Sequence, residues 1–287
     1  MFMQTIRTIQ EMQQWTAGAQ CEEKRVALVP TMGYLHEGHL SLIRLAREQA
    51  DLTVVSLFVN PAQFAPNEDF ERYPRDYARD EERCAGENVD VLFHPSADEM
   101  YAEGHSVYVE DTNISRILEG EFRPGHFRGV LTVVAKLFLA VLPDVAVFGR
   151  KDAQQLWLLR KMARDLNFRV EISAGPTVRE SDGLAMSSRN AYLKGALREQ
   201  AVCLYRALQE AKRHYQDGER NVYVLRKAML DIVTAEPDAR MEYIEIVDAE
   251  TFSPITVVYR PALALLAVRL GETRLIDNMD LAGKEPD

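Results

Sequence analysis

Apolar runs of strand length alternate with segments of helical periodicity along the first 176 residues of the chain. Residues 26–31 and 52–59 are rich in β-branched and apolar side chains, and residues 39–50, between them, carry apolar side chains at helical spacing. This pattern predicts a strand, a loop, a helix and a second strand. The alternation continues with predicted helices at 75–87, 130–142 and 151–166 and predicted strands at 89–93, 144–148 and 168–172.

Strands that alternate with helices favour parallel pairing through right-handed crossovers. Residues 1–176 are therefore predicted to form a doubly wound, Rossmann-like α/β domain, in which ligands bind at the carboxyl ends of the strands. Beyond them, two predicted helices at 197–216 and 222–235 precede predicted strands at 241–247, 262–270 and 273–276. Helices followed by strands predict a smaller α+β domain over residues 177–287.

Composition and charge narrow the class of protein. The net charge of −10, from 34 Lys+Arg against 44 Asp+Glu, argues against a nucleic-acid binder, which needs a basic surface. Three cysteines far apart in the chain, with no CxxC pair, indicate a reducing compartment. Arg7 and polar residues occupy the start, where a secretory signal needs an apolar run. The most apolar stretch, 130–142, is shorter than the ~20 residues that cross a bilayer. We expect a cytoplasmic protein without membrane or nucleic-acid partners.

The first chemically informative stretch, residues 30–39, leaves a predicted strand and enters a predicted helix. Gly33 and Gly38 permit close backbone approach, and the N–H groups of the first helical turn favour an anion such as a nucleotide phosphate. His36 and His39, three residues apart, are placed to face one ligand and donate to its phosphate oxygens. A zinc site is not favoured, because the metalloprotease motif HExxH places its histidines four apart.

A second stretch, residues 148–155, again runs from a strand end into a helix. Lys151 is suited to neutralise a phosphate, and Asp152 to hold Mg²⁺ or a ribose hydroxyl. Gln155 lies three residues beyond Asp152 and so on the same helix face, where it can bind a substrate. The alternative is a solvated, charged helix start.

A third stretch, residues 186–190, follows a turn-like segment at 181–183. Ser187, Ser188 and Arg189 offer two hydroxyls and a guanidinium, which together can grip a polyphosphate. Alone, such a sequence is most often a surface loop. With the histidine loop it predicts a second phosphate clamp.

Two further stretches are candidates for substrate contacts. Asn60 and Gln63 follow a strand end and offer two amides that can fix a hydroxylated acid, and Arg123 and His126 present two cationic groups. Either stretch in isolation is equally compatible with an ordinary loop.

Taken together, the five stretches resemble the pantothenate synthetase (pantoate–β-alanine ligase) family of the His-x-Gly-His nucleotidyltransferase superfamily. The His-x-Gly-His element alone indicates only the superfamily. VNPxQF, RPGHF, FGxKDxQQ and MSSRN, in this order between about residue 26 and residue 193, are far more specific.

The resemblance implies a ligase with two half-reactions. Pantoate attacks ATP to give pantoyl adenylate and pyrophosphate, and β-alanine then displaces AMP. The implied ATP contacts run through Met32, Gly33, Tyr34, Leu35, His36, Glu37, Gly38 and His39, with His39 as proton donor and His36 assisting at the phosphates. Lys151, Ser188 and Arg189 correspond to phosphate-gripping residues, and Gly149, Arg150, Asp152, Val178, Met186 and Ser187 to the rest of the nucleotide site. Gln63 and Gln155 correspond to pantoate-binding glutamines, with Asn60 beside them, and Arg123 and His126 to a cationic loop.

The resemblance also implies ATP with Mg²⁺, a homodimer, and a second domain that closes over the nucleotide. Two positions depart from the family pattern, since Arg150 replaces a usually acidic residue and Ala153 a commonly aromatic one. Two other functions stay open from the residues alone. One is another nucleotidyltransferase of the superfamily, and the other is a non-catalytic nucleotide-binding protein.

Overall fold

The computed structural model describes residues 3–66 and 68–283 of the chain. They fall into two compact units. The first comprises Met1–Arg150 and Gln155–Pro176, and the second comprises Lys151–Gln154 and Thr177–Asp287. Each unit has its own hydrophobic core.

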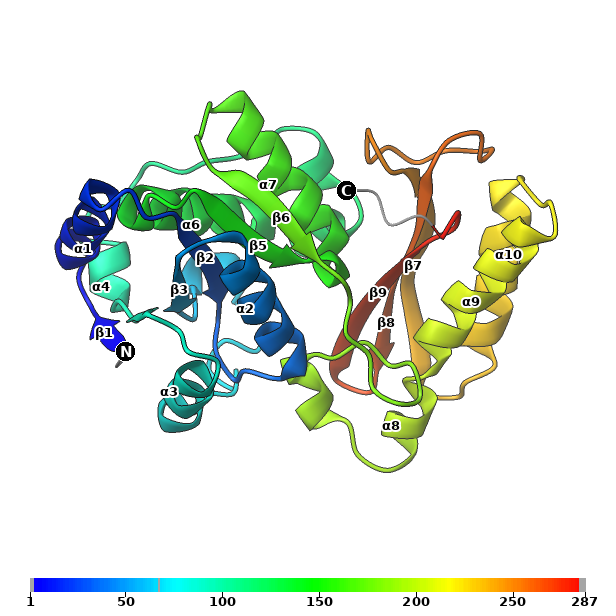
Figure 1. Cartoon of the computed structure of the whole chain (residues 1–287). Coiled ribbons are helices and arrows are strands. Elements are labelled where there is room, and N and C mark those ends of the chain that lie inside the picture. Colours follow the sequence, from blue (N-terminus) through cyan, green and yellow to red (C-terminus); the bar gives the residue numbers. More distant parts are fainter. Residues whose placement is uncertain (1–2, 67, 284–287) are drawn as a thin grey trace. The chain divides into compact units, whose positions relative to one another are not determined.

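The first unit is built on a six-stranded parallel sheet with the order β1-β4-β3-β2-β5-β6 (Figure 1). Its strands are β1 (Gln4–Ile6), β2 (Val26–Thr31), β3 (Leu52–Leu57), β4 (Val91–Phe93), β5 (Val145–Gly149) and β6 (Glu171–Gly175). Strand order reverses between β2 and its neighbour β5, which makes the carboxyl ends of these two strands the switch point where such sheets bind ligands. The predicted doubly wound fold is confirmed.

Helices cover both faces of this sheet. They are α1 (Ile9–Cys21), α2 (Glu37–Gln49), α3 (Tyr77–Gly86), α4 (Ala97–Met100), α5 (Glu119–Phe122), α6 (His126–Val141) and α7 (Ala153–Asp165), with 3-10 turns η1 (Pro61–Gln63), η2 (Ile114–Arg116) and η3 (Arg150–Asp152). Ala27 and Val29 of β2 pack with the apolar side of α2, whereas Leu28 points to the opposite face, and all three are fully buried. Among the described helices, none is long and apolar enough to cross a membrane.

The second unit is a three-stranded antiparallel sheet covered by helices. The strands are β7 (Ala239–Asp248), β8 (Ala262–Leu270) and β9 (Thr273–Asp280), and the helices are η4 (Ser188–Tyr192), α8 (Ala196–Gln200), α9 (Cys203–Gln216) and α10 (Val222–Thr234). Leu204 and Leu208 of α9 and Leu225 of α10 pack with Leu266 of β8 in one fully buried cluster. The predicted α+β character of this part of the chain is confirmed.

Several predicted elements have different bounds; β9, for example, continues to Asp280, four residues past the predicted strand at 273–276. The helix predicted over 197–216 is two helices, α8 and α9, separated by a turn at Ala201 and Val202. The strand predicted at 168–172 begins at Glu171, because Phe168 instead packs edge-on against Phe138 of α6, with ring centroids 5.4 Å apart.

Candidate active site

The loop between β2 and α2 carries the two histidines, and its backbone is bent in a way that needs support. Gly33 and Tyr34 both have left-handed backbone angles, with φ of 88° and 51°. The carboxylate of Asp80, from α3, accepts hydrogen bonds from the N–H groups of Tyr34 and Leu35, each at 2.7 Å. A Cβ at Gly33 would lie 2.9 Å from the same carboxylate, so glycine is required both by conformation and by space.

Two arginines of α3 complete this support. Arg79 and Arg83 donate to the carbonyl oxygen of Leu35 at 3.1 and 2.8 Å, and the Arg79 guanidinium lies 4.6 Å from the centre of the Tyr34 ring. Burial raises the pKa of Asp80, while the Leu35 and Tyr34 N–H groups and the charge of Arg79 oppose that shift. Sequence reasoning missed these three residues, because α3 reads as an ordinary polar helix and only the tertiary fold places it against the loop.

The geometry also narrows which backbone groups of this loop face a ligand. The N–H groups of Tyr34 and Leu35 are committed to Asp80. The anion-binding role expected of the loop therefore falls to the first turn of α2, which begins at Glu37.

His36 and His39 lie next to each other at the start of α2. Their ring centroids are 4.0 Å apart, and the backbone N–H of His36 donates to Nδ1 of His39 at 3.2 Å. A ring nitrogen that accepts a hydrogen bond carries no proton, so the neutral His39 ring holds its proton on Nε2. His39 can therefore donate from Nε2 to a phosphate oxygen.

The segment after β3 holds Gln63 through Asn60, which is almost fully buried. The Asn60 amide nitrogen donates to Gln63 Oε1 at 3.0 Å and to the carbonyl of Gly129 at 3.1 Å. Its oxygen accepts from the Ala62 N–H and from the Tyr101 hydroxyl, and burial raises the pKa of Tyr101, so this hydroxyl stays protonated. These four bonds favour a role for Asn60 in orienting Gln63 rather than the direct substrate contact predicted.

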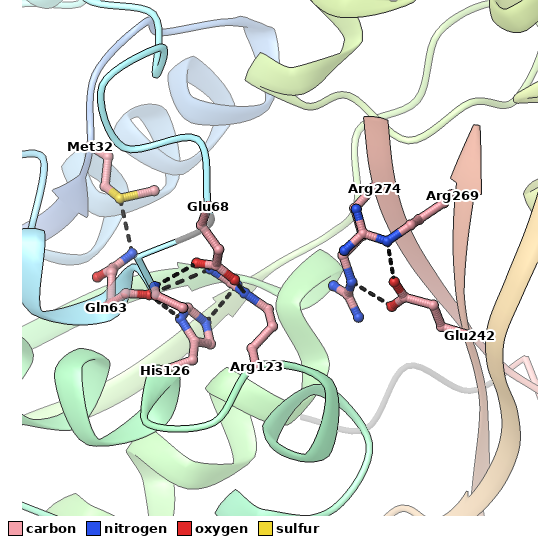
Figure 2. Close-up of polar contacts among 9 residues, drawn as sticks. Met32, Gln63, Glu68, Arg123, His126, Glu242, Arg269 and Arg274 are labelled. Atoms are coloured by element: carbon pink, nitrogen blue, oxygen red, sulfur yellow. Dashed lines mark hydrogen bonds and ion pairs between the residues drawn. The ribbon is translucent and has the colours of Figure 1, made fainter. Parts of the chain in front are cut away.

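Gln63 joins this segment to the histidine loop. Its Nε2 donates to the sulfur of Met32 at 2.9 Å (Figure 2). Thioether sulfur is a weak acceptor, so a substrate oxygen would be a better partner for the same N–H group. The predicted substrate glutamine and the predicted nucleotide loop thus meet at the carboxyl ends of the neighbouring strands β2 and β3.

Arg123 and His126 extend the same network. The Arg123 guanidinium forms a two-pronged ion pair with Glu68, at 2.6 and 2.8 Å, and donates to Nε2 of His126 at 3.0 Å (Figure 2). Because Nε2 of His126 accepts, Nδ1 carries the proton and donates to the carbonyl of Gln63 at 2.9 Å. The sequence predicted two cationic groups here, whereas the structure gives a charge-balanced arginine and a neutral histidine. Glu68 was not foreseen.

In the second unit, Lys151 and Asp152 lie directly before α7. The Lys151 ammonium is 3.6 Å from an Asp152 oxygen, and its side chain is 20% exposed, so it can still reach a ligand. Gln155, in the first unit, occupies the first turn of α7 and is partly buried. Within the described parts of the chain, no group of three or more His, Cys, Asp or Glu side chains could hold a metal ion.

The stretch that contains Ser187, Ser188 and Arg189 follows a short hairpin. The Met186 N–H donates to the Val178 carbonyl at 2.9 Å, which aligns these two predicted nucleotide contacts. The Ser187 hydroxyl then accepts from the Arg189 N–H at 3.2 Å and starts the 3-10 turn η4. One hydroxyl of the predicted clamp is thus used to shape the turn, which leaves Ser188 and Arg189 as its predicted ligand-facing groups.

Comparison with known proteins gives a consistent result. The family model for pantoate-beta-alanine ligase matches residues 4–280. Pantothenate synthetase of Thermotoga petrophila is 51% identical over 276 residues, which is 96% of this chain and 99% of the relative, and that of Caldicellulosiruptor saccharolyticus is 52% identical over 277 residues, again 96% and 99%.

Solved structures agree. The crystal structure of pantothenate synthetase from Thermus thermophilus has a TM-score of 0.92 and 45% identity, covering 97% of this chain and 99% of that one. Pantoate-beta-alanine ligase from Francisella tularensis, complexed with β-γ ATP and β-alanine, has a TM-score of 0.81 and 33% identity, covering 98% and 99%. A match of this extent shows the family and does not favour another nucleotidyltransferase, so this chain belongs to the pantoate–β-alanine ligase family.

Proposed function

We propose that this protein condenses pantoate with β-alanine to pantothenate, a coenzyme A precursor, in an ATP-dependent reaction. Membership of the ligase family supports the reaction. The structure of the Francisella tularensis relative is a complex with β-γ ATP and β-alanine, which correspond to two of the three proposed substrates. The observation that carries the assignment in this chain is the contact of Gln63 with Met32, because it brings the pantoate glutamine beside the nucleotide loop.

The reaction needs ATP because a carboxylate lacks a leaving group. A pantoate carboxylate oxygen attacks the α-phosphorus of ATP, the bond to the bridging oxygen of pyrophosphate breaks, and pyrophosphate leaves. The β-alanine nitrogen then attacks the acyl carbon of the adenylate, the carbon–oxygen bond to AMP breaks, and the amine loses a proton. Both steps depend mainly on alignment and on stabilisation of charge at the phosphates.

The nucleotide role is assigned to residues of both units. In the first unit, the loop from Met32 to His39 binds ATP through the first turn of α2 and the two histidines. Gly149 is the last residue of β5 and Arg150 follows it, at the switch point. In the second unit, Lys151, Ser188 and Arg189 grip the phosphates, while Asp152, Val178, Met186 and Ser187 complete the nucleotide contacts.

His39 is proposed to act through Nε2. The hydrogen bond from the His36 backbone to Nδ1 holds the tautomer in which Nε2 donates. The first half-reaction requires no proton transfer, so a neutral donor directed at a phosphate oxygen is sufficient to stabilise the charge that develops there.

The pantoate role is assigned to Gln63 and Gln155. Asn60 orients Gln63, and Arg123 and His126 shape the site by holding the Gln63 carbonyl and the segment that carries Glu68. In this scheme Arg123 and His126 act without presenting a free positive charge to the substrate.

Mg²⁺ is proposed to accompany ATP. Mg²⁺ bound to nucleotides commonly takes one or two protein carboxylates, with phosphate oxygens and waters as the remaining ligands. Asp152, which lies beside Lys151 and has a half-exposed side chain, fits that requirement. The ion would offset phosphate charge and bind phosphate oxygens.

The cellular setting follows from the same function. We propose a cytoplasmic homodimer in which residues 1–176 bind ATP and pantoate and residues 177–287 close over the nucleotide. Nucleotide-bound and nucleotide-free crystal structures with the same interdomain angle would refute the closure.

One assay tests the reaction. The protein is incubated with ATP, Mg²⁺, pantoate and β-alanine, and AMP is followed. We expect AMP to form only when pantoate and β-alanine are both supplied in steady state. AMP that forms without pantoate, or no AMP at all, would refute the proposed function.

The same assay tests the phosphate contacts. His39→Ala and Lys151→Ala are each expected to slow adenylate formation by ~10²-fold or more, as is typical when a transition-state donor is removed. His214→Ala and Lys227→Ala are the controls and should retain wild-type rates. They remove a half-buried and an exposed side chain of the second unit, paired with Glu210 and Asp231. Near-normal turnover of the first pair would contradict their assigned roles.

A further inference from the structure

Two adjacent residues of β9, Asp277 and Asn278, are buried and have no part in the site as assigned so far. Asp277 is 3% exposed and Asn278 is 9% exposed. Both lie in the second unit. The side chain of each contacts a different one of the two proposed phosphate-gripping segments of that unit, and the Asn278 carbonyl also accepts from Arg179 at 3.3 Å.

Asp277 fixes the hairpin of residues 178–186. Its carboxylate accepts hydrogen bonds from Nη1 and Nη2 of Arg179, at 2.6 and 3.0 Å. Arg179 also donates to the carbonyl of Gly183, at the far side of the hairpin turn, at 3.0 Å, and stacks 4.7 Å from the ring of Tyr205. One guanidinium therefore ties both arms of the hairpin to β9.

The hairpin in turn sets the position of the serines and of Arg189. Val178 and Met186 are joined across it at 2.9 Å, and Arg189 lies only three residues after Met186. The Asn190 side chain then bonds back to Glu180 and to the carbonyl of Ala185. A shift of the hairpin on β9 would move the whole clamp.

Asn278 fixes the other segment. Its Nδ2 donates to the backbone carbonyl of Lys151 at 2.8 Å, and its own N–H donates to the Asp277 carboxylate at 2.8 Å. Burial raises the pKa of Asp277, and the nearby positive charges of Arg179 and Lys151 oppose that shift. Strand β9 thus holds the hairpin through Asp277 and Lys151 through Asn278.

Stability alone is a weak reason for this arrangement. A buried ion pair repays its desolvation poorly, and an apolar pair of similar volume often serves the fold as well. What the two polar residues supply is geometry, because a two-pronged carboxylate–guanidinium pair and a side-chain amide bond each allow one orientation of their partner.

We propose that Asp277 and Asn278 are positioning residues for adenylate formation, holding Lys151 and the Ser188–Arg189 clamp in the relative placement that one polyphosphate requires. This inference rests on the proposed function of those residues. It adds to that function a strand that orders two segments far apart in the sequence.

The test uses the full-length protein and two variants, Asn278→Ala and Asp277→Asn. After circular dichroism and thermal unfolding establish the folded fraction, kcat and KM are measured separately for ATP and for pantoate. We expect kcat/KM for ATP to fall by ~10-fold or more, since misplacement by about 1 Å can cost up to ~10²-fold. The KM for pantoate should change by less than about 2-fold, because neither substitution removes a contact assigned to pantoate.

Glu245→Gln is the matched control. Glu245 is a partly buried carboxylate of the same sheet that pairs with Arg226 of α10 at 3.2 Å. Wild-type ATP kinetics in folded Asn278→Ala would overturn the inference. A KM for pantoate that rises as much as the KM for ATP would overturn it as well. If Asp277→Asn fails to fold, Asn278→Ala alone decides. Absence of pantoate-dependent AMP from the wild type would instead show that the proposed function itself is wrong, and the inference with it.

Discussion

Asp80 shows how one side chain can shape the proposed nucleotide loop through hydrogen bonds to its backbone. Its two oxygens each receive one backbone N–H of the loop, so its shape and its acceptor count both matter. Asp80→Asn keeps the shape but replaces one acceptor oxygen by an NH₂ group, which faces a donor. We expect kcat/KM for ATP to fall by ~10-fold, as for a displaced catalytic loop. Steady-state kinetics check this, with the exposed Asp231→Asn as control.

The difference in unfolding free energy between the wild type and Asp80→Asn should depend on pH. Burial raises the pKa of Asp80, so the folded state binds a proton at higher pH than the unfolded state. Its stabilising contribution is then fully present below the unfolded pKa and is lost as the pH rises through the folded pKa. The wild type should therefore gain stability relative to Asp80→Asn between about pH 7 and about pH 4. Urea unfolding at both pH values measures the free energy of unfolding of each protein. If the wild type instead loses stability relative to Asp80→Asn on acidification, the proposed burial effect is contradicted.

Residue chemistry explains which site residues were predictable. The histidines, Lys151 and the serine–arginine stretch can be recognised as candidates from residue type and spacing within a few positions. Asp80 and Glu68 do not, because their partners lie far away in the sequence and a carboxylate on a polar segment carries no local signal. For Asn60 and Arg123, the residue was predictable but its hydrogen-bond partners were not.

At the scale of elements, periodicity located most strands and helices of the sheet. The strand predicted at 26–31 coincides with β2, since a central parallel strand is apolar on both faces. The first helix, α1, was missed because its apolar stripe is weak. Its start does carry a local signal, in which Thr8 caps the N–H of Glu11 and donates to the Glu11 carboxylate.

The contact between α6 and η1 predicts the effect of one added methyl group. A Cβ at Gly129 would lie 2.1 Å from the carbonyl oxygen of Ala62 and 2.6 Å from the Gln63 N–H nitrogen. Gly129→Ala must therefore separate the two elements and shift Gln63. We expect a loss of ~1–3 kcal/mol in the free energy of unfolding, from overpacking. We also expect the KM for pantoate to rise more than the KM for ATP.

Gly18→Ala is the control for this substitution. Gly18 lies inside α1 with nothing within 4 Å of its added Cβ, so alanine should stabilise the helix by ~0.5–1 kcal/mol without a change in KM. Kinetics and urea unfolding of both variants separate the two outcomes. An unchanged pantoate KM in Gly129→Ala would show that Gln63 does not depend on this contact.

At the scale of the whole molecule, each of the two units has a buried apolar cluster of its own, while the proposed nucleotide contacts come from both units. Periodicity predicted the two kinds of fold. It did not show that residues 151–154 group with the second unit, because that grouping depends on contacts such as the one between Asn278 and Lys151. A strand distant in sequence determines where a predicted catalytic lysine belongs.

This division supplies a last test, because the two tryptophans, Trp15 and Trp157, both belong to the first unit. Tryptophan fluorescence therefore reports unfolding of that unit. ATP at ~100 times its dissociation constant should stabilise the wild type by ~2.7 kcal/mol. The midpoint temperature of thermal unfolding, followed by tryptophan fluorescence, should therefore rise. If Lys151 of the second unit grips the same nucleotide, Lys151→Ala weakens binding and reduces this shift at equal ATP concentration, whereas Lys227→Ala leaves it unchanged. A full shift in Lys151→Ala would mean that ATP binds without the second unit's lysine, and the proposed joint role of the two units would fail.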